Sequence, residues 1–191
     1  EVGSFIALGA ATRSSLRIVD AQPQNQRITR AAFRRLGVSW DVDGNDILIG
    51  DSQELCVQAD FDGATPQIAD LPWPGFPPDL ISIAIVLATQ CSGSVLISQR
   101  MFDRRLVFVD RLIAMGASIV QCDPHRVVVL GPRRLHPIVL SSPDIRAVMA
   151  MVIAALCADG ETIIRNVEQI DRGYGHLEQR LAALGADIER S

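Results

Sequence analysis

The sequence of 191 residues contains no lysine, and all 18 of its basic side chains are arginine. Chemistry that depends on a lysine amine therefore has to come from another chain segment. The sequence also lacks any apolar run of the ~18 residues that a membrane-spanning helix needs, and its longest run, 147–158, predicts a buried helix instead. The net charge of −4 gives no general attraction to nucleic acid or to an anionic membrane, so neither partner is expected.

Cysteine is scarce as well, and its four occurrences show neither a C-x-x-C pair nor a histidine-rich neighbourhood. We therefore expect no metal site and no cofactor. Cys91 and Cys157 lie near the ends of apolar helix patterns, which predicts small core residues in a reducing compartment, and we expect the cytoplasm. No signal peptide pattern is present. Because the sequence starts at Glu1 rather than at methionine, we expect a fragment of a longer chain, and a preceding targeting segment stays open.

One pattern occurs three times along the chain. It predicts the end of an amphipathic helix, a capping glycine and then a strand. Its copies are RRLGVSW at 34–40, IAMGASI at 113–119 and AALGADI at 182–188. Each copy is preceded by a predicted strand, at 15–20, 94–99 and 161–167. Further back lies an apolar helix each time, at 2–12, 78–90 and 143–158.

The repeats predict the fold class. Additional strands are expected after the first two copies, at 46–50, 56–60, 126–131 and 137–141, joined by turns rich in Gly, Asp and Pro. The fold predicted is an α/β (α+β) domain of three helix–strand–helix–strand units, at about 1–70, 71–141 and 142–191. With 48% hydrophobic residues, a single domain over 1–191 can bury a core. We expect the strands that would complete the first and third units to come from outside this sequence.

Two of the long helices begin with the same residues, in GFPPDLISIAI and LSSPDIRAVMA. Proline is favoured at the first helical position, and an acid one residue later meets the positive end of the helix dipole. Asp79 and Asp144 therefore have a complete structural explanation, and a chemical role for them stays open beside it.

The short helices are predicted to begin with arginine, although a cation opposes the dipole there. Arg104 and Arg105 follow Asp103, and Arg172 follows Asp171. The first copy offers two more arginines, at Arg27 and Arg30. Exposed N–H groups together with a guanidinium can bind a phosphate or a carboxylate. The alternative is a solvated arginine paired with the neighbouring aspartate, and these patterns do not decide between the two.

Four stretches, in this order and spacing, carry a family resemblance: PGFPPD, FDRRLVFVDRLIAMGA, SPDIRA and IDRGYGHLEQRLAALGADIER. They resemble the C-terminal half of bacterial UDP-N-acetylglucosamine enolpyruvyltransferases, also called UDP-N-acetylglucosamine 1-carboxyvinyltransferases. The resemblance implies two similar domains, each an inside-out α/β barrel of three repeats with central helices and outer sheets. It also implies a transferase that moves the enolpyruvyl group of phosphoenolpyruvate to the 3′-hydroxyl of UDP-N-acetylglucosamine and releases phosphate. That reaction commits peptidoglycan synthesis, and with it cell wall growth, cell shape and division.

The resemblance also implies roles for single residues. Asp79 falls on the acid of the family's P-[GA]-F-P-T-D motif and is similar to its proposed general base. Arg105 falls on the arginine of F-E-N-R, Asp144 and Arg146 on D-L-R-A, and Arg172 on I-D-R-G-Y. These residues are expected around phosphoenolpyruvate, whose carboxylate and phosphate call for several converging arginines.

The sequence departs from the family pattern in two ways. Pro78 replaces the threonine before the acid, and Val148 replaces a small residue after D-L-R-A. The family's proton donor and an active-site lysine belong to the N-terminal half, so this fragment alone is expected to be inactive and its partner to be that missing domain. Two alternatives stay open: a non-catalytic ligand-binding or regulatory homologue, and the 3-phosphoshikimate branch or the RNA-end-cyclising enzymes. The motif IDRGYGHLE argues against that second alternative.

Overall fold

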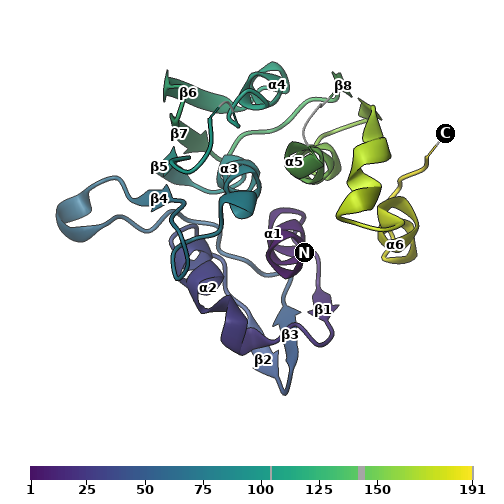
Figure 1. Cartoon of the computed structure of the whole chain (residues 1–191), viewed down its shortest axis with the longest axis horizontal. Coiled ribbons are helices and arrows are strands. Elements are labelled where there is room, and N and C mark those ends of the chain that lie inside the picture. The colour runs from purple at the N-terminus through teal and green to yellow at the C-terminus, as the bar shows by residue number, and fades with distance from the viewer. Residues whose placement is uncertain (104, 142–144, 191) are drawn as a thin grey trace.

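Three α-helices form the centre of the molecule (Figure 1). The computed structural model describes residues 1–103, 105–141 and 145–190, with the backbone alone at 141, 145, 146, 168, 169 and 172. The central helices pack against one another and are α1 (Val2–Ala11), α3 (Ile81–Thr89) and α5 (Ile145–Leu156). All nine residues of α3 and nine of the ten residues of α1 are buried. A helix that is apolar on every side, as ISIAIVLAT is, needs this enclosure by other elements.

Three sheets lie around these helices (Figure 1). The first is antiparallel, in the order β1 (Leu16–Ile18), β3 (Asp46–Ile49), β2 (Asp41–Asp43). The second has the order β4 (Gln67–Ala69), β5 (Gly93–Ser98), β7 (Arg126–Gly131), β6 (Ser118–Asp123), and within it only β4 and β5 run parallel. The third pairs β8 (Val139–Ser141) with β9 (Ile163–Arg165) in parallel.

The short helices confirm the repeated pattern. They are α2 (Arg27–Arg34), α4 (Val109–Ala114) and α6 (Leu177–Ala183), and the 3₁₀ turns are η1 (Pro23–Gln26), η2 (Phe61–Gly63), η3 (Pro78–Leu80) and η4 (Val167–Arg172). The three predicted capping glycines, Gly37, Gly116 and Gly185, follow the α-helices with φ of 84°, 96° and 96°. Glycine fits such a cap because a side chain would be strained at positive φ.

Successive units are linked by strands that cross from one to the next. β4 follows the strands of the first unit but pairs with β5 of the second. In the same way, β8 follows the second unit and pairs with β9 of the third. An isolated bridge between Cys56 and Ser92 adds a further contact between the first two units.

Two strand expectations were wrong, and one strand, β4, was not expected. Residues 56–60 form only the single bridge at Cys56, because the chain then projects away from the body of the molecule (Figure 1) and finds no partner along that stretch. Residues 186–190, after Gly185, pair with no strand in the described part of the chain. β4 was not expected, since its three residues carry no alternating pattern and are fixed by pairing with β5.

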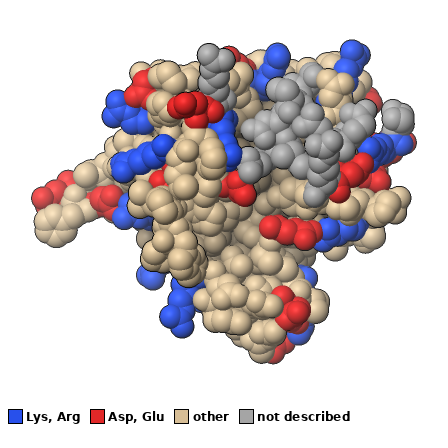
Figure 2. Space-filling view, in the orientation of Figure 1, with Lys and Arg blue, Asp and Glu red and all other residues tan. Residues whose placement is uncertain are grey.

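The cysteines differ in burial, and the surface carries charges of both signs. Cys91 is buried, as predicted, Cys157 is half-buried rather than a full core residue, and Cys56 and Cys122 are exposed. Figure 2 shows acidic and arginine side chains interspersed over one face of the molecule. Among the described residues, no helix is long and apolar enough to span a membrane, and no group of His, Cys, Asp or Glu could hold a metal ion.

Candidate functional site

The segment 72–80 is anchored ahead of α3. Its Phe76 side chain is buried and meets Phe33 edge-on, with ring centroids 6.1 Å apart. The backbone N–H of Leu71 donates to the Phe76 carbonyl at 3.1 Å, which closes the loop on itself. The loop therefore holds the helix start that follows it in one place.

Asp79 lies in that helix start, as the second residue of η3, which runs directly into α3. Its side chain is 60% exposed, so the carboxylate faces the surface rather than the core. The structural explanation of Asp79, an acid in the first turn of a helix, agrees with this position. The exposure also leaves the carboxylate accessible to a ligand.

Arg105 meets Asp79 from the other side. Its Nη1 donates to Asp79 Oδ1 at 3.4 Å, and its guanidinium lies 3.6 Å from the centroid of the Phe102 ring. The Arg105 side chain is only 15% exposed, which means that stacking and burial hold it in place. The expected position was wrong in one respect, because α4 begins at Val109 and Arg105 lies in the turns before it.

Tyr174 brings the last motif close to the same site. Its hydroxyl and that of Ser4 in α1 form a hydrogen bond of 2.8 Å. Burial raises the pKa of Tyr174, the negative charges of Glu1 and Asp79 add to this, and the hydrogen bond with Ser4 opposes it. The Asp79 carboxylate therefore lies within electrostatic reach of the segment that also contains Arg172.

The other predicted site residues fall partly outside the described structure. Asp144 and Arg104 lie outside the described residues, as do the side chains of Arg146 and Arg172. The backbone of Arg146 belongs to α5 and that of Arg172 ends η4. Arg172 therefore precedes α6 instead of beginning it, which corrects the expectation. The structure brings together Asp79 and Arg105 and leaves the placement of the other three side chains a prediction.

Some of the helix-start arginines and aspartates are engaged within the protein. Arg30 donates to the Trp40 carbonyl at 2.9 Å, with its guanidinium 5.2 Å from the Trp40 ring centroid. Asp171 pairs with Arg190 at 2.9 Å. For Arg30 these contacts favour a structural role over an anion site.

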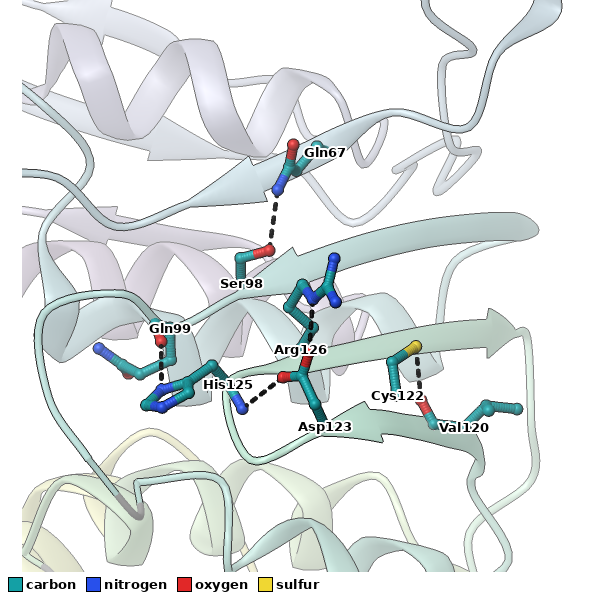
Figure 3. A network of polar contacts seen from close by, with 8 residues as sticks. All are labelled: Gln67, Ser98, Gln99, Val120, Cys122, Asp123, His125 and Arg126. Atoms are coloured by element: carbon teal, nitrogen blue, oxygen red, sulfur yellow. Dashed lines mark hydrogen bonds and ion pairs between the residues drawn. The ribbon is translucent and has the colours of Figure 1, made fainter.

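A second polar network lies on the outer sheet (Figure 3). It surrounds an open pocket of about 450 Å³ lined by Ser98, Arg100, Asp103, Asp123, His125 and Arg126. Asp123 accepts the His125 backbone N–H at 2.8 Å and pairs with Arg126 at 2.6 Å. Both contacts lower the pKa of Asp123, and the hydrogen bond from His125 has the larger effect. His125 Nε2 lies 3.5 Å from Asp103 Oδ1 at the edge of this pocket.

Two residues near the site were missed in the sequence. Tyr174 belongs to a motif that was noticed for its arginine alone, and only its contact with Ser4 reveals its place. Asp70 is a fully buried carboxylate at the end of β4, and because β4 itself was not predicted, no pattern marked it.

Comparison with known sequences gives one family and a consistent set of relatives. The family model described as EPSP synthase (3-phosphoshikimate 1-carboxyvinyltransferase) matches residues 1–181. A UDP-N-acetylglucosamine 1-carboxyvinyltransferase of Treponema denticola is 55% identical over 99% of this chain, and one of Bradyrhizobium diazoefficiens is 54% identical over the whole of this chain. The chain spans only 44% of the length of either relative.

Solved structures agree on the fold. The enolpyruvyl transferase NikO from Streptomyces tendae superposes on the whole chain with a TM-score of 0.85 at 25% identity, and 43% of that protein is covered. An EPSP synthase from Acinetobacter baumannii superposes with a TM-score of 0.67 at 17% identity, also over the whole chain and 43% of its own length. This mixed α/β domain thus matches the enolpyruvyl transferase fold.

Proposed function

Because the chain belongs to the EPSP synthase (3-phosphoshikimate 1-carboxyvinyltransferase) family, we propose that it forms one domain of an enolpyruvyl transferase. The full-length protein transfers the enolpyruvyl group of phosphoenolpyruvate to the 3′-hydroxyl of UDP-N-acetylglucosamine. The observation that carries this proposal is the pairing of Asp79 with Arg105, 3.4 Å apart, in a chain 55% identical to a UDP-N-acetylglucosamine 1-carboxyvinyltransferase. The reaction commits peptidoglycan synthesis, and the proposed location is the cytoplasm.

The proposed chemistry assigns the proton of the sugar hydroxyl to Asp79. As the hydroxyl oxygen forms its bond to the enol carbon, the Asp79 carboxylate accepts the hydroxyl proton, and the methylene carbon gains a proton from the donor of the other domain. Loss of a proton from the resulting methyl group then restores the double bond while phosphate leaves with the oxygen that joined it to the enol carbon. A carboxylate held beside the hydroxyl suits this role, since general bases work by direct hydrogen bonding. The exposure of Asp79 in the first turn before α3 supports the assignment.

The arginines and Asp144 are proposed to line the phosphoenolpyruvate site. Arg105 supplies a guanidinium that burial and the Phe102 ring hold in place. Arg146 and Arg172 supply further cations for the carboxylate and the phosphate of the substrate, and Asp144 orders them. Support for these three comes from their places in the motifs, SPDIRA and IDRGY.

The proposed architecture is a single domain over 1–191, an inside-out α/β barrel of three units at about 1–70, 71–141 and 142–191. Mutual packing of α1, α3 and α5, with sheets around them, supports it. The proposed partner is a second domain of the same chain, since the curated relatives are more than twice as long. That domain supplies the proton donor and the lysine, so residues 1–191 alone are expected to give no turnover.

An acceptor comparison tests the proposal. We would purify the full-length protein and measure phosphate release from phosphoenolpyruvate with either UDP-N-acetylglucosamine or 3-phosphoshikimate as acceptor. The proposal expects release with the sugar nucleotide and none with 3-phosphoshikimate. Release with 3-phosphoshikimate alone would assign the other branch, and binding of both substrates without release would identify a non-catalytic homologue.

A further inference from the structure

Asp70 lies between the two loops that carry Asp79 and Arg105. It follows β4 directly and is 0% exposed. Its backbone N–H donates to the Ser98 carbonyl at 3.3 Å, and it forms an isolated bridge with Phe76. The main chain of Asp70 thus joins the end of β5 to the loop that leads to Asp79.

The carboxylate of Asp70 holds the second loop. Its oxygens accept the backbone N–H groups of Arg100 and Met101, the latter at 3.2 Å, and the side-chain amide of Gln99. Gln99 is itself 2% exposed, so the Asp70 and Gln99 side chains meet in the protein interior. The three donors fix the direction of the chain where it leaves β5 toward Phe102 and Arg105.

A buried carboxylate needs such donors because removing a charge from water is costly. Here the described donors are all neutral, two backbone N–H groups and one amide, so the carboxylate is satisfied by the geometry of the loop itself. An apolar side chain would fill the same space at less cost, but it would leave the partly buried N–H groups of Arg100 and Met101 without this acceptor. The cluster therefore specifies one conformation of residues 99–101.

The other side of this loop has its own tether, which Figure 3 shows. The Gln99 N–H donates to the His125 carbonyl at 2.8 Å, and His125 Nδ1 lies 3.1 Å from the Gln99 carbonyl oxygen. The main chain of Gln99 is thus bonded to the β6–β7 hairpin while its side chain reaches Asp70. Of the two attachments, only the one to Asp70 also reaches the loop that carries Asp79.

We propose that Asp70 is a positioning residue that sets the placement of Arg105 relative to Asp79. The proposal rests on the proposed function, because it links Asp70 to two residues of the proposed substrate site. Asp70 itself is fully buried and acts on these residues without reaching that site. It acts through the loops 71–78 and 99–103, and an error of about 1 Å at a reacting group can cost about 100-fold in rate.

The first test measures hydrogen exchange in the loop after β5 and does not depend on turnover. In the full-length protein, Asp70→Asn places an amide against donors, and hydrogen exchange is measured by mass spectrometry on peptides that cover 98–106. Faster exchange is expected there and not elsewhere. Asp46→Asn is the matched control, since Asp46 also accepts a backbone N–H, from Asp20 at 2.8 Å, in the separate first sheet.

The second test is kinetic and uses a swapped pair. Asp70→Asn should lower kcat/KM for phosphoenolpyruvate at least 10-fold, with Asp46→Asn unchanged. The double variant Asp70→Asn with Gln99→Glu reverses donor and acceptor between two buried side chains and keeps the hydrogen bond. Because Met101 N–H shares Oδ2 with the Gln99 amide and loses this acceptor in the swap, we expect partial recovery, with kcat/KM about 3-fold or more above that of Asp70→Asn alone, a non-additive result. If Asp70→Asn does not fold, Gln99→Leu removes one donor and should give a smaller loss in the same direction.

The outcomes separate this inference from the proposed function. Wild-type protein that releases no phosphate would overturn the proposed function, while the exchange experiment would still test the loop. Unchanged exchange over 98–106 in Asp70→Asn would overturn the inference, as would kcat/KM within 2-fold of wild type. A swapped pair no better than Asp70→Asn alone would overturn it too.

Discussion

Asp79 and Arg105 are 26 positions apart in the sequence and belong to different loops. The position of Asp79 at a helix start could be predicted from the sequence, because proline followed by an acid is favoured in the first turn of a helix. Nothing in its spacing indicated Arg105 as the partner, since that contact depends on how two loops fold over β5. The family resemblance supplied both residues, and the structure adds their separation of 3.4 Å.

The role of Arg105 can be tested by neutralising it. In the full-length protein, Arg105→Gln should raise KM for phosphoenolpyruvate about 10- to 100-fold, because a hydrogen bond to a charged group contributes roughly 1.5–3 kcal/mol. Arg126→Gln is the control, since that guanidinium pairs with Asp123 on the outer sheet. Steady-state kinetics with varied phosphoenolpyruvate decides, and an unchanged KM would remove Arg105 from the substrate site.

The cysteines give a prediction about pH. Burial raises the pKa of both Cys91 and Cys157 from 9.0 to about 12, so both stay protonated at pH 8. We expect iodoacetamide at pH 8 to label the exposed Cys56 and Cys122 much faster, as read by peptide mass spectrometry. The raised pKa applies to the folded state, whereas in the unfolded state the thiols ionise near pH 9. The free energy of unfolding is therefore unaffected by these thiols below about pH 9 and decreases as the pH rises toward 12. Equal labelling of all four thiols in the folded protein would contradict the described burial.

At the scale of the elements, repetition made most of the chain predictable. Apolar runs located α1, α3 and α5, and the capping glycines located the ends of α2, α4 and α6. Short strands were harder to predict from the sequence. β4 forms because it pairs with β5, whereas residues 56–60 have no such partner beyond a single bridge at Cys56 and form no strand. Local pattern thus predicts elements that bury a whole face, whereas three-residue strands depend on their neighbours.

Three residues with positive φ, one in each unit, give an element-scale prediction. Arg13, Gly93 and Gly160 lie at or just before β1, β5 and β9, with φ of 53°, 116° and 121°. A side chain at Gly93 would be strained, and its Cβ would lie 3.0 Å from Val57 Cβ, so Gly93→Ala should cost about 1–3 kcal/mol. Arg13→Gly should be tolerated within about 1 kcal/mol, because relief of left-handed strain offsets the added flexibility of glycine.

Thermal melts of the full-length protein compare the two variants. A loss of 1 kcal/mol in a domain of this size lowers the melting temperature by roughly 2–4 °C. We expect Gly93→Ala to melt several degrees below wild type and Arg13→Gly to melt close to it. The reverse order would show that the two positions are not equivalent starts of one repeated unit.

For the whole molecule, the arrangement explains why the proposed site lies at the ends of elements. The centre is filled by apolar helices, so polar groups collect in the loops that enter and leave them, as Asp79 does ahead of α3. The chain spans 44% of its curated relatives, and a cleft between two domains would place those loops against the other half. The exposed carboxylate of Asp79 agrees with such a shared site.

The most direct measurement is phosphate release by full-length Asp79→Asn with phosphoenolpyruvate and UDP-N-acetylglucosamine, beside calorimetric binding of the sugar nucleotide. If Asp79 is the general base, the rate should fall at least about 100-fold, the usual contribution of a positioned base, while the Kd of UDP-N-acetylglucosamine stays within about 3-fold. Turnover near the wild-type rate in that variant would contradict the account, because the pairing of Asp79 and Arg105 would then serve only the start of a helix.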